Sequence, residues 1–175
     1  MTLTGYPELL DRRRLLDLAR LGLDFPAPRP YLDEIVESVT DRLDMPFAVV
    51  DSLLDGAQLF LAGRGPMPEW VSEAGGTPIE WAFCCPMLRS RTARYVSDLA
   101  VDPEFRDNPL VVIEGVRAYI GAPLISSSGA VLGGLCALDV RPREFTPAQL
   151  GLMRDLAGET VRRIEARAEP AIMGP

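Results

Sequence analysis

Three cysteines are the side chains in this sequence best suited to nucleophilic or redox chemistry. Cys84 and Cys85 are adjacent, close to a predicted helix start, and Cys136 lies in a later apolar run. A helix N-terminus lowers the pKa of a thiol and favours the reactive thiolate. The pattern therefore allows a redox switch in which Cys84 or Cys85 reacts and Cys136 is the resolving partner. The alternative is three reduced, buried cysteines. An odd number without CxxC spacing predicts no zinc or iron–sulfur site, which would need about four ligands.

Other catalytic groups are missing from the sequence. The chain has no histidine and its 18 basic residues are all arginine, which removes the commonest general base, metal ligand and haem ligand. It also has no Gly-rich phosphate loop and no GxSxG motif. We therefore expect a non-catalytic protein without haem, and one that is not a histidine kinase core.

A second group of residues could form a small-molecule site, because it combines aromatic rings with a few polar groups. The candidate pocket consists of Trp81, Phe83, Cys84, Tyr95, Asp98, Phe105, Asn108, Arg117, Tyr119, Gly134 and Cys136. Gly133 and Gly134 fall within a strand, where glycine often marks a close approach to the backbone. A ligand there should be small, partly aromatic and not strongly anionic, since no Gly-rich nest is present. The alternative is that Trp81 and Phe83 fill the core and that Asp98 caps a turn.

Strands and helices that would position these residues can be read from the hydrophobic pattern. Apolar runs at 118–125 and 130–138 flank a Ser-Ser-Ser-Gly turn and predict a central hairpin. Residues 47–51 and 58–62 predict two strands around Asp55-Gly56, and 94–97 predicts another. Helices are expected over 7–23, 30–43, 79–90 and from Pro147 after the cap Thr146. Thr77 is expected to cap the third helix, and Pro86 is expected to kink or split it. Residues 63–76 are expected to form a loop.

This order of elements, with its motifs, resembles the GAF domain. The motifs are GAPL, the strand VLGGLCALD, the following Pro-Arg, the FTPAQ helix start, Phe83-Cys84, Val96-Ser97-Asp98 and DPEFRDNP at 102–109. The resemblance covers about Tyr31 to Arg167 and is closest to bacterial GAF domains found beside histidine kinases, diguanylate cyclases and serine phosphatases. It implies an α+β, PAS-like fold. An antiparallel sheet of five or six strands would carry the terminal helices on one face and an insertion, residues 63–116, on the other.

The resemblance also reduces the number of ligand classes to consider. Cys84 matches the cysteine of an FCxH-like motif, but Pro86 stands where that histidine usually is. Relatives that attach a linear tetrapyrrole also use a histidine, and those that bind cyclic GMP carry a pattern that Phe105, Asn108 and Glu114 do not reproduce. The cysteines do not match those of the GAF-like enzymes that reduce free methionine sulfoxide. We expect neither bilin nor cyclic GMP, and we expect a regulatory sensor of a small molecule or a partner protein that signals through its terminal helices.

Composition sets the remaining expectations. The net charge of −7 argues against nucleic-acid binding. No apolar run approaches the ~20 residues of a membrane span, and the N-terminus does not read as a signal peptide, so a cytoplasmic location is expected. We divide the chain into an N-terminal segment, 1–28, a GAF domain, 29–168, and a disordered tail, 169–175. Leucine-rich stripes at 8–21 and 150–164 predict a homodimer.

Overall fold

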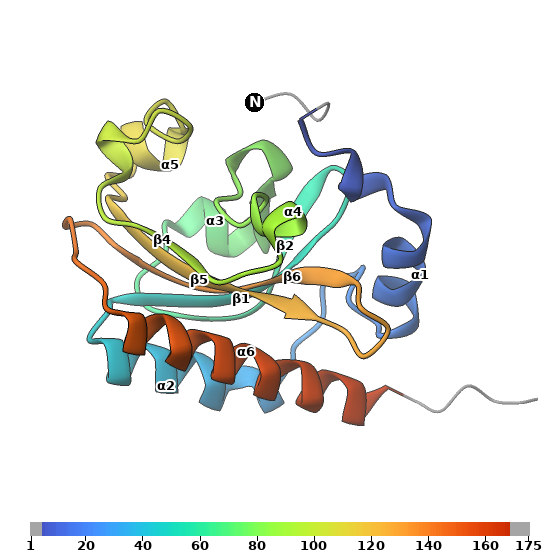
Figure 1. Cartoon of the computed structure of the whole chain (residues 1–175). Coiled ribbons are helices and arrows are strands. Elements are labelled where there is room, and N and C mark those ends of the chain that lie inside the picture. Colours follow the sequence, from blue (N-terminus) through green and yellow to red (C-terminus); the bar gives the residue numbers. More distant parts are fainter. Residues whose placement is uncertain (1–4, 169–175) are drawn as a thin grey trace, which may run out of the picture.

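An antiparallel sheet of six strands organises the computed structural model, which describes residues 5–168 (Figure 1). The predicted tail, 169–175, lies outside the described residues. The strand order is β3-β2-β1-β6-β5-β4. The strands are β1 Phe47–Leu53, β2 Ala57–Arg64, β3 Gly76–Pro78, β4 Arg94–Val96, β5 Ala118–Ile125 and β6 Val131–Asp139. The predicted central hairpin is confirmed, because β6 lies between β1 and β5.

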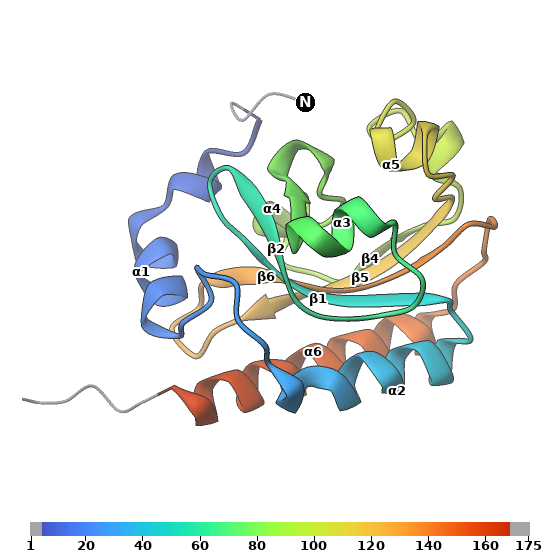
Figure 2. The ribbon, with the colours of Figure 1, turned by 180° about the vertical axis from the view of Figure 1, so that it is seen from behind.

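Two helices cover one face of the sheet, as the sequence predicts. Helix α2, Asp33–Leu43, and helix α6, Pro147–Arg167, lie side by side under the sheet (Figures 1 and 2). Thr146 and Gln149 form a capping box at the start of α6, which satisfies backbone donors that the first turn would leave unpaired. The apolar stripes of both helices pack on the inward-facing residues of the central strands. Val39 of α2 and Met153 of α6 belong to the same buried core as the strand residues Val50, Ile120 and Leu135.

The opposite face carries the predicted insertion, but its local structure differs from the prediction. Residues 63–76 are not all loop, since helix α3 spans Glu69–Ala74. The helix expected over 79–90, with a kink or split at Pro86, is divided, and the break begins before that proline. A 3₁₀ turn, Ile79–Trp81, is separated from the four-residue helix α4, Met87–Ser90, by residues 82–86, which consist of Ala82 in an extended conformation and a turn at 83–86. Thr77 lies in β3 opposite Gln58 and caps nothing. A 3₁₀ turn at Leu99–Val101 and helix α5, Pro109–Val112, complete this layer.

The N-terminal segment packs against the end of the sheet. A 3₁₀ turn, Pro7–Leu10, precedes helix α1, Arg12–Arg20, and Asp11 separates them by accepting a hydrogen bond from the Arg14 N–H at 2.9 Å. Gly22, with φ of +69°, lies just beyond the helix end. Arg14 on this helix is only 4% exposed. Its guanidinium donates to the backbone oxygens of Leu53 at 2.6 Å and Leu9 at 2.9 Å, so α1 is joined to the end of β1.

A bulge in β6 shifts which side chains face each layer. The pairing with β5 passes from Leu124–Gly133 to Ile125–Val131, so Leu132 is the extra residue. As a result, Leu132 packs with Leu135 in the core under α2 and α6, whereas Val131 packs with Cys136 on the insertion side. Strict alternation along the strand would place Val131 and Leu135 on the same face, and the bulge puts them on opposite faces.

Candidate functional site

The aromatic part of the predicted pocket is a packed core. Phe83, Phe105 and Tyr119 are 4%, 2% and 1% exposed. The ring of Phe83 lies edge-on to Phe105, with centroids 5.3 Å apart, and 5.8 Å from Tyr119. These rings fill the space between β5 and the insertion, which is the alternative that the sequence left open for Phe83. Gly134 faces the same layer, where the side chains of Cys84, Met87 and Cys136 pack over it.

The remaining predicted pocket residues are dispersed. Tyr95 is 43% exposed and packs on Phe145, which belongs to the helix-covered side of the sheet. Asp98 accepts the Ala100 N–H and forms a two-point ion pair with Arg117, both contacts at 2.7 Å. This pair holds the pKa of the Asp98 carboxyl below its usual value.

Trp81 and Asn108 lie nearer the surface. Asn108 caps α5 and donates to the Trp81 carbonyl at 3.2 Å, and the Trp81 ring lies edge-on to Trp70. With Phe105 they line a depression of about 290 Å³ that also contains Glu80, Glu104 and Asp107. The structure therefore brings three of the predicted residues to one surface, beside three carboxylates.

Asp51 forms the centre of a buried polar cluster that the sequence analysis missed. It is 0% exposed and projects from β1 toward the insertion. Its carboxylate accepts hydrogen bonds from Gln58 Nε2 at 2.9 Å and from the Gly134 N–H at 3.0 Å. Burial raises the pKa of Asp51 to about 6, although these hydrogen bonds oppose the rise. The signal in the sequence is a single acidic residue within the apolar run of β1.

Two of the three cysteines converge on Asp51. Cys84 Sγ lies 3.5 Å from each carboxylate oxygen, and Cys136 Sγ lies 3.8 Å from Oδ2. Tyr119 completes the group, with its hydroxyl 3.6 Å from Cys136 Sγ. Cys85 points elsewhere, toward the carbonyl of Ile79 at 3.9 Å. All three thiols are buried.

The thiols do not have the lowered pKa that the sequence suggested. Helix α4 begins only at Met87 and has four residues, so Cys84 and Cys85 do not occupy its first turn. The contact with Cys136, burial and the charge of Asp51 raise the pKa of Cys84 well above its usual value. Burial raises the pKa of Cys85 to about 12. A helix-activated thiolate is therefore absent from the described residues.

An apolar pocket of about 400 Å³ lies on the insertion side of the sheet, beside this cluster. It is lined by Phe47, Phe60, Pro66, Met67, Pro68, Val71, Thr77, Leu110, Glu114, Val116, Leu138 and Val140. The floor comes from β1, β2 and β6, and the cover from the segment around α3 and from α5. None of these residues was in the predicted pocket. The only sequence signal was the Gly- and Pro-rich segment 63–76, which does wrap over the sheet.

Two polar groups in the pocket have defined partners. Glu114 accepts a hydrogen bond from Trp70 Nε1 at 3.1 Å. Thr77 donates to Gln58 Oε1 at 2.9 Å, and Gln58 in turn donates to Asp51. A chain of hydrogen bonds thus leads from the pocket wall to the buried cluster.

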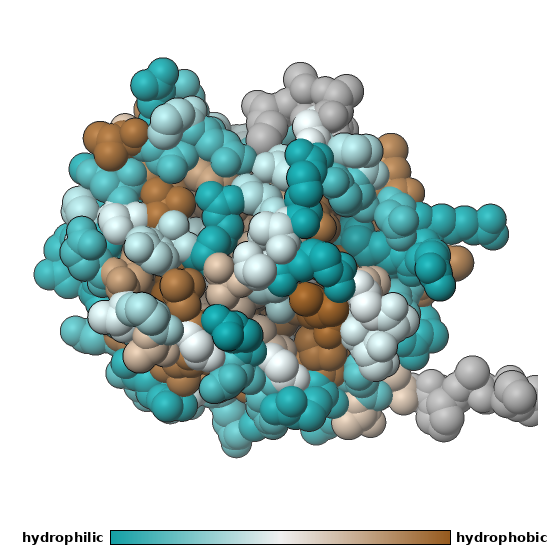
Figure 3. Space-filling model, viewed as in Figure 1, coloured by the Kyte–Doolittle hydropathy of each residue, from teal (hydrophilic) through white to brown (hydrophobic). Residues whose placement is uncertain are grey.

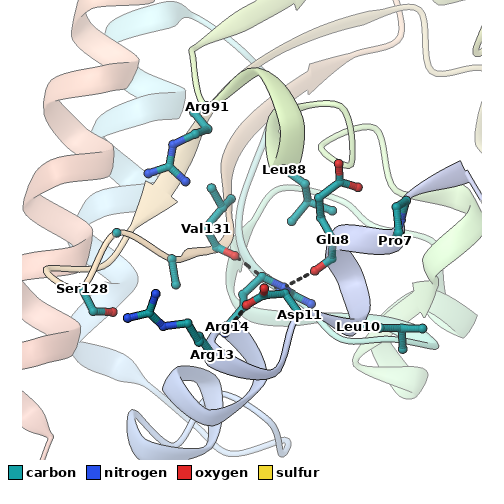
Figure 4. A pocket seen from close by; sticks show the side chains of 12 residues that line it. Pro7, Glu8, Leu10, Asp11, Arg13, Arg14, Leu88, Arg91, Ser128 and Val131 are labelled. Carbon is teal, nitrogen blue, oxygen red and sulfur yellow. Dashed lines mark hydrogen bonds between the residues drawn. The ribbon is translucent and has the colours of Figure 1, made fainter.

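A second pocket, of about 460 Å³, lies between α1, α4 and the β5–β6 turn (Figure 4). Figure 4 shows the side chains of Arg13 and Arg91 extending toward the side of the pocket where Ser128 lies. Asp11 and Glu8 also line it, so both charge signs are present. The face of the molecule drawn in Figure 3 is mostly hydrophilic with scattered apolar groups. Exposed apolar side chains include Val112 and Ile113 at α5, which are 67% and 75% exposed.

Comparison with known proteins agrees with this architecture. The model of the GAF domain family matches residues 28–164. A cyclic di-GMP phosphodiesterase of Pseudomonas aeruginosa, PA2567, is 33% identical over 144 residues, which are 82% of this chain and 23% of that protein. The chain thus spans about a quarter of this relative.

Solved structures show the same fold at low sequence identity. The GAF domain of the Acinetobacter phosphoenolpyruvate-protein phosphotransferase superposes with a TM-score of 0.66 at 19% identity, covering 93% of this chain and 99% of that one. A type II free methionine-R-sulfoxide reductase from Thermoplasma acidophilum gives 0.63 at 10% identity, covering 79% and 92%. Within residues 5–168, no helix is both long and apolar enough to cross a membrane. Because the family model matches residues 28–164, which is most of the chain, we conclude that the chain belongs to the GAF domain family.

Proposed function

We propose that this GAF domain is a regulatory sensor that binds a small, largely apolar molecule in the pocket lined by Phe60, Leu138 and Glu114. The pocket itself is the observation that carries the proposal. Its volume of about 400 Å³ falls in the range of about 300–1,000 Å³ typical of ligand sites. Its lining is mainly apolar with few polar groups, which is the usual composition of such sites.

The charge of the pocket defines the ligand class. Glu114 is the one ionisable residue among its lining residues, and no arginine is there to neutralise an anion. A carboxylate in a partly enclosed apolar space repels anions and favours neutral or cationic groups. The proposed ligand is therefore neutral or weakly basic, with an aromatic or aliphatic body.

The position of the pocket supports a route for the signal. Its floor strands, β1, β2 and β6, carry α2 and α6 on their other face. A ligand that wedges between the floor and the cover around α3 favours one spacing of these layers over another. A ligand that binds one arrangement of the layers more tightly than the other shifts the equilibrium toward the arrangement it prefers. The terminal helices would report that shift to the rest of a longer protein.

A neutral fluorescent probe tests the pocket directly. N-phenyl-1-naphthylamine should bind saturably to the chain, with one site, and its fluorescence should rise in the apolar space. Leu138→Trp fills the floor and should abolish that binding, while overpacking costs only ~1–3 kcal/mol of stability. Native mass spectrometry of freshly purified protein should then show a co-purifying molecule that the probe displaces.

Ile125→Trp is the matched control for this experiment. Ile125 is also half-buried on the insertion side of the sheet, but it does not line the pocket. It should leave probe binding unchanged. Unsaturable binding, or equal loss in the two variants, would contradict the proposal.

Two further expectations stay predictions. A partner protein is favoured as a second kind of ligand by the exposure of Val112 and Ile113, and Ile113→Ser should weaken such an interaction without affecting probe binding.

The redox alternative requires Cys84 or Cys85 to react. Titration of the native protein with a thiol reagent checks it, and reaction no faster than that of a free cysteine would exclude it.

A further inference from the structure

The cluster of Asp51, Cys84 and Cys136 has the chemistry of a metal site. One ligand atom from each of the three residues lies within 4.8 Å of the others, and all three residues are buried. They come from β1, from the segment before α4 and from β6, so only the fold brings them together. Spacing along the chain gave no sign of this group.

The distances within the cluster match those between ligands of one tetrahedral ion. Zinc binds thiolate sulfur at about 2.3 Å and carboxylate oxygen at about 2.0 Å, which places the two ligand atoms about 3.5 Å apart. The observed separations between sulfur and Asp51 oxygen are 3.5 Å for Cys84 and 3.8 Å for Cys136. The two sulfur–oxygen separations therefore fit ligands of a single ion.

The surroundings of Asp51 provide no counter-charge. Within residues 5–168, its hydrogen-bonding partners are an amide, a backbone N–H and two thiols, and they include no arginine. Buried carboxylates are ordinarily paired with a cation or bound to a metal ion. Arg14, which is also buried, is occupied by backbone carbonyls.

Gly134 leaves room for the two sulfurs. A Cβ at this position would lie 3.1 Å from Cys136 Sγ and 3.2 Å from the Cβ of Cys84. Both contacts are tighter than ordinary van der Waals packing, so an added side chain would press on the Cys136 sulfur and on the Cys84 side chain. A residue much larger than alanine at position 134 would therefore force Cys84 and Cys136 to move.

We infer that Asp51, Cys84 and Cys136 bind a thiophilic divalent cation, with Zn²⁺ as the expected ion. Gln58 supplies the fourth ligand, because its amide end lies 2.9 Å from Asp51 Oδ2 and 3.6 Å from Cys84 Sγ. Turning that amide brings Oε1 to the ion, and the Thr77 hydroxyl then accepts a hydrogen bond from Nε2. Binding displaces one proton from each thiol, which leaves two thiolates and a carboxylate around the ion.

The test is metal analysis of the whole chain, folded in the presence of the ion because the site is buried. Protein unfolded in urea with reductant, refolded with ZnSO₄ and desalted should retain about one zinc per chain by mass spectrometry of the elements. Refolding with CoCl₂ should give the thiolate-to-cobalt charge-transfer absorption of a tetrahedral site. The refolded zinc form should melt at a higher temperature than the metal-free form.

Cys85→Ser is the matched control, since Cys85 is equally buried but outside the cluster. Cys84→Ser and Cys136→Ser should lose the zinc and the cobalt band, whereas Cys85→Ser should keep both. If the serine variants fail to fold, the cobalt spectrum and the melting shift of the unaltered chain decide. The inference would be overturned if the unaltered chain showed neither the cobalt absorption nor the melting shift. It would also be overturned if Cys85→Ser were the variant that lost zinc while Cys84→Ser and Cys136→Ser kept it. The probe experiment on the apolar pocket is independent of this result.

Discussion

Gly133 and Gly134 are adjacent in β6, yet replacing each with alanine should have very different effects. At Gly133, an added Cβ would collide with the backbone of β1, because it would lie 2.7 Å from the Asp51 carbonyl carbon and 2.8 Å from the Ser52 Cα. At Gly134, the nearest atoms belong to the side chains of Cys136, Cys84 and Met87, at 3.1–3.2 Å. The first obstacle is a strand and the second is a set of side chains.

The difference in stability follows from those distances. Carbon atoms pack at about 3.5–4.0 Å, so the contact with the Asp51 carbonyl carbon alone requires β1 and β6 to separate by at least about 0.8 Å in the centre of the sheet. The Asp51 carbonyl oxygen would lie closer still and requires a larger separation. We expect a loss of ~3–5 kcal/mol of unfolding free energy, in the range of severe core substitutions. Gly134→Ala needs only a few tenths of an ångström, which the flexible end of Met87 can supply. The ~0.5–1 kcal/mol gained by replacing a strand glycine offsets that strain, so the net change should be within about 1 kcal/mol.

Urea denaturation followed by circular dichroism measures both variants against the unaltered chain. The midpoint should fall sharply for Gly133→Ala and hardly move for Gly134→Ala, with the same slope for all three proteins. Equal midpoints for the two variants would refute the pairing of Gly133 with Ser52. A larger loss of stability in Gly134→Ala than in Gly133→Ala would mean that β6 is shifted by one residue, because such a shift exchanges the two faces of the strand.

Three further predictions concern the N-terminal segment. Asp17→Asn should destabilise the protein at pH 7. Burial raises the pKa of Asp17, but hydrogen bonds from two serines and Arg20 outweigh it and lower the pKa overall. The stabilisation is therefore present above the unfolded value of 3.8 and is lost at more acidic pH, so the two urea midpoints should converge as the pH falls below 3.8. Arg14→Ala should cost ~3–5 kcal/mol by leaving buried carbonyls without donors, measured the same way, and a loss under ~1 kcal/mol would contradict its role. Leu16, 58% exposed on α1, is the proposed dimer contact, so Leu16→Glu should convert a dimer to a monomer in light scattering, and a monomeric unaltered chain would exclude the dimer.

The features predicted correctly from the sequence depend on neighbours along the chain. The hairpin around Ser127 needs only two apolar runs and a turn, and the cap at Thr146 needs only the residues that follow it. The apolar stripes of α2 and α6 predicted that both helices cover a sheet, and the resemblance to the GAF domain placed them on the same face. The same rules failed at residues 79–90. There, Thr77 satisfies its hydrogen bonds through Gln58 on a neighbouring strand, an interaction that no local pattern encodes.

The candidate site depended on contacts between distant parts of the chain. Asp51 and Gly134 are 83 residues apart, and Asp51 and Cys84 are 33 apart. Cys84, Cys136 and Gly134 were identified by residue type, but their common partner was not, because an isolated aspartate in an apolar strand has no motif. The apolar pocket was missed for a related reason. Phe47, Phe60 and Leu138 read as ordinary core residues until the cover around α3 is seen to leave space above them.

The buried Arg14 changes where this domain can be said to begin. The family match starts at residue 28, and a fragment cut there would lack Arg14. It would expose the carbonyl oxygens of Leu53 and Val131, which the guanidinium contacts at 2.6 and 3.4 Å. It would also lose Leu23, whose carbonyl accepts a hydrogen bond from Ser52 in β1 at 2.7 Å. The residues that stabilise the fold therefore begin upstream of the segment matched by the family model. A fusion or truncation that starts at residue 28 would destabilise β1 and β6 at the end nearest the Asp51 cluster.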